Sequence, residues 1–212
     1  MTIEVWSDVV CPWCYIGKRR LTEAIASLPE LADVTVVHRA FQLDPTATNT
    51  GERTVDHLAS KYGITTEDAL GMMDDVSEVA ETVGLTYDLA NTRHGNTRDA
   101  HRLLLWAQER GQADATLERL YSGYFEHGES VFTVDDLLRI AGEAGLDVPA
   151  ARTMLESDAF VGEVLADQQL AHDFGSRGVS FFVIDRRFGL SGAQPLDVFV
   201  ETLRQAAASP VA

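Results

Sequence analysis

The chain has 212 residues, of which 45% are hydrophobic and 24% are charged, as is ordinary for a globular protein with a sizeable core. Its 33 acidic residues outnumber its 17 basic residues, and the formal net charge of -16 argues against nucleic acid or an anionic membrane as a partner. No apolar run approaches the roughly 20 residues of a membrane span, and the first residues lack the basic and apolar segments of a secretory signal. We therefore expect a cytoplasmic protein with no membrane partner.

The first predicted elements are a strand, a helix and a second strand. Residues 3–6 form a short apolar run, which predicts a strand. Apolar residues after Pro12 recur at helical spacing, so we expect a helix from Pro12 to about Leu28, where a proline follows. Residues 34–41 are rich in β-branched side chains and predict the second strand, which a polar stretch follows.

The middle of the chain, from about residue 53 to residue 175, predicts helices alone. Glycines mark many of the boundaries and are typical of helix C-caps. Thr66 and Thr133 are expected N-caps, because a threonine oxygen accepts a hydrogen bond from a free N–H group of the first turn. The expected helices span residues 53–62, 66–83, 97–110, 114–127, 134–144, 149–157 and 159–174.

Strands return near the C-terminus. Residues 181–184 form an apolar strand, residues 185–187 a turn and residues 188–191 the partner strand, which together predict a hairpin. Pro195 begins a final helix whose apolar residues lie at helical spacing.

This order of elements predicts an α/β fold in which one small mixed sheet is interrupted by helices. The simplest assembly is a discontinuous domain of residues 1–45 and 176–212. A helical insertion domain of residues 46–175 then separates its two halves.

Both cysteines of the chain lie in Cys11-Pro12-Trp13-Cys14, between the first strand and the first helix. Pro12 fits the first helical position, which puts Cys11 beside unpaired N–H groups and the positive end of the helix dipole. This environment favours the thiolate, which is the form that attacks a disulfide. Cys14 lies one turn further along and is expected to be shielded. The motif therefore predicts thiol–disulfide exchange with Cys11 as the nucleophile and Cys14 as the resolving thiol.

A zinc site and an inert core pair are the alternative roles of the two cysteines, and the sequence favours redox chemistry over both. A closed zinc site needs four ligands, but the chain has no further cysteine, and the spacing of His94 and His101 is unusual for a histidine pair in such a site. Free cysteines are often inert core residues, although a C-x-x-C motif at a strand–helix junction is more typical of redox chemistry. We expect no metal at the pair and no required cofactor.

The β-α-β half, the Cys-Pro-Trp-Cys motif and the closing β-β-α half resemble the thioredoxin fold, and the helical insertion resembles its DsbA-like branch. More narrowly, the chain resembles the FrnE-like group of cytoplasmic DsbA-family oxidoreductases. The resemblance rests on four stretches in the expected order: residues 7–17, 41–45, 96–102 and 181–195.

This resemblance implies that Cys11 and Cys14 exchange electrons through a mixed disulfide with protein or small-molecule thiol substrates. Glutathione is an expected redox partner, and the insertion is expected to cover the active site and shape a substrate groove. A homodimer through the insertion is a further expectation.

The chain departs from the thioredoxin pattern before the third strand, where a cis-proline is typical and Ser180 follows Val179 here. Since a cis bond before a non-proline residue costs ~2.5–4 kcal/mol, we expect the Val179–Ser180 peptide to be trans, or strained if it is cis. We also expect Ser180 to leave the chemistry of Cys11 and Cys14 intact but to alter the release of mixed disulfides.

Several further residues each have a functional and a structural interpretation. Trp13 either tunes the potential of the pair or is an exposed platform for substrates. His101 either faces the active site or is a hydrogen-bonded structural residue. Arg98 and Arg102 either hold a carboxylate such as that of glutathione or form salt bridges. Asp8 is either a proton acceptor or a cap of the turn.

Two rival functions stay open. Kappa-type glutathione transferases and 2-hydroxychromene-2-carboxylate isomerases resemble this architecture and use glutathione, but they usually carry a serine at the position of Cys11. A chaperone-like protein with an apolar groove in the insertion is the non-enzymatic rival.

Overall fold

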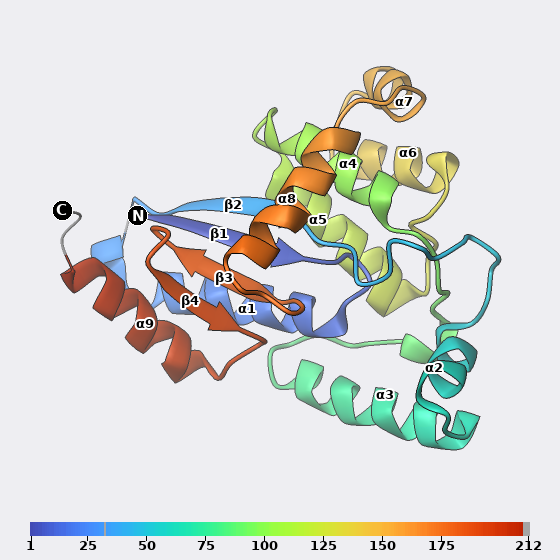
Figure 1. Ribbon diagram of the computed structural model, residues 1–212, viewed down its shortest axis with the longest axis horizontal. Helices are drawn as coiled ribbons and strands as arrows, with labels where there is room; N and C mark the ends of the chain where they lie inside the picture. Colours follow the sequence, from blue (N-terminus) through green and yellow to red (C-terminus); the bar gives the residue numbers. More distant parts are fainter. Residues whose placement is uncertain (32, 210–212) are drawn as a thin grey trace.

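The computed structural model describes residues 1–31 and 33–209, and its centre is one four-stranded sheet (Figure 1). The strand order is β2-β1-β3-β4. β1 (Thr2–Ser7) is parallel to β2 (Thr35–Ala40) and antiparallel to β3 (Phe181–Ile184), and β3 pairs antiparallel with β4 (Phe188–Ser191). The predicted mixed sheet and the predicted hairpin are confirmed.

Helices cover both faces of this sheet. α1 (Pro12–Ala26) and α9 (Leu196–Ala208) pack on one face, and α8 (Val161–Asp173) crosses the other (Figure 1). Alternation along β1 explains the two layers, because Ile3 and Val5 point toward α1 and α9 whereas Trp6 points toward α8. α1 ends two residues before the predicted limit, and a short 3₁₀ turn (Pro29–Leu31) follows it.

The chain between β2 and β3 is helical, as predicted. One difference is that the helix expected over residues 114–127 ends at Tyr121 and continues as a π turn, Ser122–Glu126. Another short 3₁₀ turn is Leu89–Asn91. The helices are α2 (Thr54–Tyr62), α3 (Thr66–Glu81), α4 (Arg98–Gln108), α5 (Ala113–Tyr121), α6 (Val134–Glu143), α7 (Val148–Leu155) and α8.

The helix caps show what local sequence decides. Thr133 is the N-cap of α6, as predicted, and its side chain accepts from the N–H of Asp136. The predicted cap of α3 is wrong by one residue, because Thr65 and not Thr66 accepts from the N–H of Asp68. Asp68 lies three residues after Thr65 and hydrogen-bonds back to it, so a capping box selects Thr65.

The largest apolar cluster joins α1 to the helices between β2 and β3, and it contains both cysteines. The motif of residues 11–14 therefore lies where the helical segment meets the sheet half of the molecule. The division into two domains stays a prediction, and residues 210–212 of the first predicted domain lie outside the described residues. Within the described part of the chain, no helix has the length and apolar character needed to cross a membrane.

Candidate functional site

The two cysteines flank the start of α1. Cys11 is the N-cap and Pro12 is the first residue of the helix, as the sequence predicts. The backbone turns tightly here, since the N–H of Cys14 donates to the carbonyl of Cys11 at 2.9 Å and the N–H of Cys11 to that of Asp8 at 3.1 Å. Both cysteines are free thiols, and they are only 4% and 3% exposed.

The two thiols have different neighbours. Cys11 Sγ lies 3.7 Å from the carbonyl oxygen of Val179, to which it donates a weak hydrogen bond. Burial raises the pKa of the Cys14 thiol well above its usual value, and the adjacent Cys11 raises that pKa further. A hydrogen bond from Ser180 opposes part of this rise. The Cys14 thiol is therefore held in its protonated form by its surroundings.

The loop before β3 corrects one expectation, because the Val179–Ser180 peptide is cis and the predicted trans geometry is wrong. Ser180 is 1% exposed, and its hydroxyl donates to the carbonyl of Trp13 at 3.1 Å. Its own carbonyl accepts from the N–H of Gly192 at 2.7 Å. These contacts join the loop to α1 and β4. The expectation of a trans peptide considered only the local cost of a cis bond and not these contacts between distant segments.

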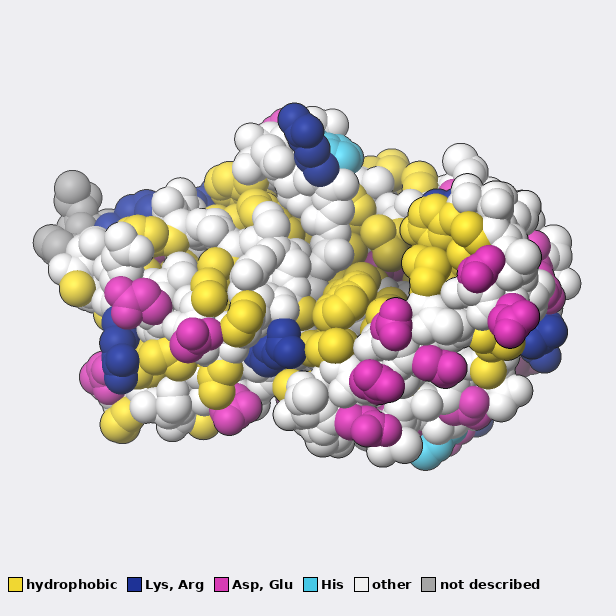
Figure 2. Space-filling view, turned by 90° about the horizontal axis from the view of Figure 1, so that it is seen from below, with side chains coloured by type: hydrophobic (Ala, Val, Ile, Leu, Met, Phe, Trp, Pro, Cys, Tyr) yellow, Lys and Arg dark blue, Asp and Glu magenta, His cyan; other side chains and the backbone are white. Residues whose placement is uncertain are grey.

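A pocket of about 360 Å³ opens beside Cys11. Its lining is mostly apolar, and Lys61 is the one charged residue among the described residues that line it. Trp13 and Met72 line it and are 38% and 46% exposed, so apolar surface reaches solvent at its mouth. Figure 2 shows hydrophobic side chains gathered in a hollow near the middle of the face seen from below. This pocket can therefore hold an apolar group next to Cys11.

Tyr87 is a residue of the site that the sequence did not predict. Its hydroxyl donates to the carbonyl of Pro12 at 2.8 Å, and its ring lies 5.0 Å from that of Phe125. Burial raises the pKa of Tyr87, with a further rise from Cys11, so the hydroxyl stays a donor. Tyr87 lies in an irregular segment without hydrophobic periodicity, so no pattern in the sequence pointed to it.

His101 lies behind the site and not in the pocket beside Cys11. It is fully buried on α4, and its Nε2 is 3.3 Å from Oδ1 of Asp8. The other carboxylate oxygen of Asp8 accepts from the N–H of Leu43 at 2.7 Å. Asp8 thus joins the turn before Cys11 to α4 and to the loop after β2. This arrangement supports the structural interpretation of both residues.

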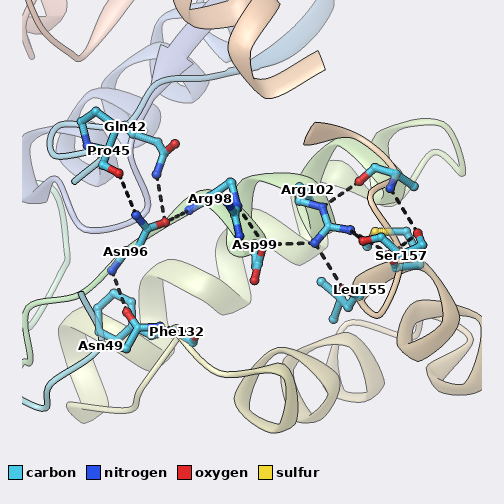
Figure 3. Close-up of polar contacts among 12 residues, drawn as sticks. Gln42, Pro45, Asn49, Asn96, Arg98, Asp99, Arg102, Phe132, Leu155 and Ser157 are labelled. Atoms are coloured by element: carbon cyan, nitrogen blue, oxygen red, sulfur yellow. Dashed lines mark hydrogen bonds and ion pairs between the residues drawn. The ribbon is translucent and has the colours of Figure 1, made fainter. Parts of the chain in front are cut away.

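Arg102 and Arg98 differ in their surroundings (Figure 3). The buried guanidinium of Arg102 donates to the carbonyls of Ala159, Met154 and Leu155 at 2.7, 2.9 and 3.3 Å, and also to that of Ser157. These carbonyls lie at and after the end of α7, so the contacts of Arg102 support its structural interpretation. Arg98 has a side chain that is 53% exposed and lies 3.4 Å from the carboxylate of the neighbouring Asp99.

Asn96 joins the loop after β2 to the segment before α4 (Figure 3). Its amide donates to the carbonyl of Pro45 at 3.0 Å, and its side-chain oxygen accepts from Gln42 at 3.1 Å. Its backbone N–H donates to Asn49 at 2.8 Å. The stretches 41–45 and 96–102, on which the family resemblance partly rests, therefore meet in space and brace one side of the site.

A second cavity, of about 410 Å³, lies on the other side of Cys14, between α1, the sheet and α5. Three of its buried polar atoms have no hydrogen-bond partner in the described structure: Ser7 Oγ, His38 Nδ1 and the hydroxyl of Tyr121. Burial lowers the pKa of His38 to about 4, so its imidazole is neutral at neutral pH.

His38 is expected to make stability depend on pH. Its folded pKa of about 4 lies below the usual 6.5, so the unfolded chain binds more protons between these values. The stability from the neutral ring is full above about pH 6.5 and declines as the pH falls toward 4, by about 2 kcal/mol between pH 7 and 5. Urea unfolding of the wild type and of His38→Phe at both pH values measures the difference. The same exchange at the exposed His127 is the control, and equal pH dependence in wild type and His38→Phe contradicts the expectation.

Comparison with known proteins gives one family. The model of the DSBA-like thioredoxin domain matches residues 2–204. The crystal structure of a probable DsbA oxidoreductase from Streptomyces coelicolor shares 41% sequence identity and has a TM-score of 0.95. The match covers 100% of this chain and 92% of that one.

Two other solved structures share the fold at lower identity. A 2-hydroxychromene-2-carboxylate isomerase is 15% identical with a TM-score of 0.72, and the match covers 99% of this chain and 100% of that one. The cytosolic disulfide reductase DsbM from Pseudomonas aeruginosa, solved with GSH, is 17% identical with a TM-score of 0.68 and the same coverage. Both confirm the predicted architecture and show no more than the fold.

Proposed function

This chain belongs to the family of DSBA-like thioredoxin domains, and from that we propose that it is a thiol–disulfide oxidoreductase acting through Cys11 and Cys14. The observation that carries the proposal is the placement of both thiols at the start of α1, with Cys11 on the wall of an apolar pocket. Cys14 is buried and lines the second cavity instead.

In the proposed reaction the Cys11 thiolate attacks one sulfur of a substrate disulfide. A bond between Cys11 and that sulfur forms, the substrate S–S bond breaks, and the other sulfur leaves as a thiolate. Cys14 then attacks Cys11, its proton passes to a leaving thiolate, and the second substrate sulfur is released. The substrate gains two electrons and the enzyme pair becomes a disulfide, while the reverse sequence oxidises a dithiol.

Glutathione is the proposed small-molecule partner, and the cytoplasm the proposed location. Support comes from DsbM, which is named a cytosolic disulfide reductase and was solved with GSH. Protein disulfides are the other proposed substrates, because the apolar pocket beside Cys11 suits an apolar side chain. The homodimer stays a prediction.

A redox titration in glutathione buffers tests the proposal. Because Trp13 lies between the two cysteines, we expect its fluorescence and the thiol count to change together. One two-electron transition is expected between roughly −120 and −270 mV, the span of known exchangers. A pair that stays oxidised below about −300 mV is a structural disulfide and contradicts the proposal.

The glutathione-dependent isomerase is the second candidate, and the apolar pocket beside the start of α1 is the observation that favours it. Isomerase activity with added glutathione that survives Cys14→Ser would support it. Prevention of aggregation by the Cys11→Ser, Cys14→Ser double variant would instead support the chaperone-like rival.

A further inference from the structure

Two histidines near the pocket lie face to face. The rings of His57, on α2, and His94, before α4, stack with centroids 3.5 Å apart and 8° between their planes. Asp44 Oδ2 lies 3.6 Å from Nε2 of His94, and Glu52 Oε2 lies 3.6 Å from Nδ1 of His57. Two imidazoles and two carboxylates thus meet where the loop after β2, the start of α2 and the segment before α4 converge.

The donor atoms of Asp44, His57 and His94 all lie within 4.8 Å of one another. Throughout residues 1–31 and 33–209, no other group of three or more His, Cys, Asp or Glu side chains meets this condition. The three side chains are between 18% and 32% exposed, so an ion can reach them from solvent. This is a mixed nitrogen and oxygen donor set, unlike an ordinary patch of surface acids.

We propose that Asp44, His57 and His94 form a binding site for a divalent cation of the Zn²⁺ type. Imidazole and carboxylate are ligands of such ions, and three protein ligands leave a fourth position for water. Glu52 Oε2 lies 3.6 Å from Nδ1 of His57, so a small approach would let the carboxylate accept a hydrogen bond from Nδ1 and leave Nε2 for the ion. Carboxylates commonly orient metal-binding histidines in this way.

Binding requires a small rearrangement. Ligands at 2.0–2.2 Å around a tetrahedral zinc ion lie about 3.4 Å apart, and the donor atoms lie within 4.8 Å of one another, so no donor pair has to close by more than roughly 1.4 Å. An imidazole ligates an ion in its own plane, and two parallel rings cannot both do so as they stand. One ring must therefore turn out of the stack, which partly exposed side chains permit.

The site would fix one wall of the pocket beside Cys11. The backbone already joins the segments, since the N–H of His94 donates to the carbonyl of Glu52 at 2.9 Å. Leu43 and Leu58, the neighbours of Asp44 and His57 in the chain, line the pocket. Lys61 acts on His94 electrostatically and opposes a cation, so we expect reversible binding and not the affinity of a closed structural zinc site.

The test uses the full chain with Cys11→Ser and Cys14→Ser, which removes the two thiols as competing ligands. Zinc binding is measured by competition with a chromophoric chelator, and each variant is checked by circular dichroism and a thermal melt without metal. We expect one zinc ion per chain. His57→Ala and His94→Ala should each weaken binding at least about a hundredfold, and Glu52→Gln about tenfold.

The exposed His127→Ala is the matched control and should bind zinc like the parent. His57→Gln and His94→Asn are the conservative variants to use if an alanine variant misfolds. Zinc is also expected to raise the melting temperature of the parent but not of the His94 variants. The proposal is overturned if the double serine variant does not bind zinc, or if the His57 and His94 variants bind zinc as tightly as the parent. Neither of these results bears on disulfide exchange, because that activity is measured separately in the protein that keeps both cysteines.

Discussion

The Cys14→Ser variant is expected to accumulate a mixed disulfide at Cys11 that the wild type resolves. The attacking thiol remains in this variant, but the thiol that releases the substrate is gone. Cys11→Ser is expected to form no adduct and to lose turnover on the order of a hundredfold or more, because the nucleophile itself is removed. Mass spectrometry after incubation with oxidised glutathione detects the adduct as one added glutathionyl group.

The two single variants are matched controls for each other, since each keeps one thiol in the same turn. An adduct on Cys14 in the Cys11→Ser variant, in place of one on Cys11, would reverse the proposed roles. The position of Cys11 on the wall of the apolar pocket and the raised pKa of the Cys14 thiol argue for the roles as assigned. Dissociation of the adduct with added thiol also tests the role expected for Ser180. If Ser180→Pro in the Cys14→Ser background leaves the lifetime of the mixed disulfide unchanged, Ser180 has no part in its release.

Arg102→Met is expected to lower the free energy of unfolding by about 3 kcal/mol or more, while the chemistry of the cysteine pair persists in the folded fraction. The buried guanidinium bonds the carbonyls of Met154, Leu155 and Ala159, and it also pairs with Asp99 at 3.0 Å. Methionine fills much of the same space but donates nothing. The carbonyls of Leu155 and Ala159 therefore lose the guanidinium as a donor, and the melting temperature should fall by about 10 °C.

Arg98→Met on the same helix is the matched control, because the side chain of Arg98 is 53% exposed and its ion pair is a surface pair. Its expected effect on stability is below about 1 kcal/mol. If Arg102→Met instead left stability unchanged and raised the KM for glutathione, Arg102 would hold a substrate carboxylate and the structural role would be wrong.

The local elements of the fold could be predicted because neighbouring residues decide them. The hairpin of β3 and β4 follows from an apolar run, a polar turn and a second run. Pro12 predicted the start of α1, and with it the position of Cys11. The misplaced cap of α3 is still a local error, since Asp68 selects Thr65 by its spacing. The π turn of Ser122–Glu126 has no such signal in the sequence.

The candidate site, in contrast, depends on contacts between residues that lie far apart in the sequence. His101 and Asp8 are 93 positions apart, and the sequence had no means of showing that their side chains meet. Tyr87 contacts the carbonyl of Pro12 from 75 positions away, out of a segment without periodicity. The stack of His57 on His94 also brings together residues that the spacing of either one does not connect.

By itself the sequence determined the mixed sheet, the helices between its halves and the thiol pair at the start of α1. These follow from periodicity, turn residues and the spacing of two cysteines, which all act over a few residues. Only the tertiary structure decided which thiol lines the apolar pocket, how the Val179–Ser180 peptide is held and which side chains surround the pair. The physical reason is that burial, hydrogen bonding across segments and pKa shifts arise from packing between distant parts of the chain, which no local pattern contains.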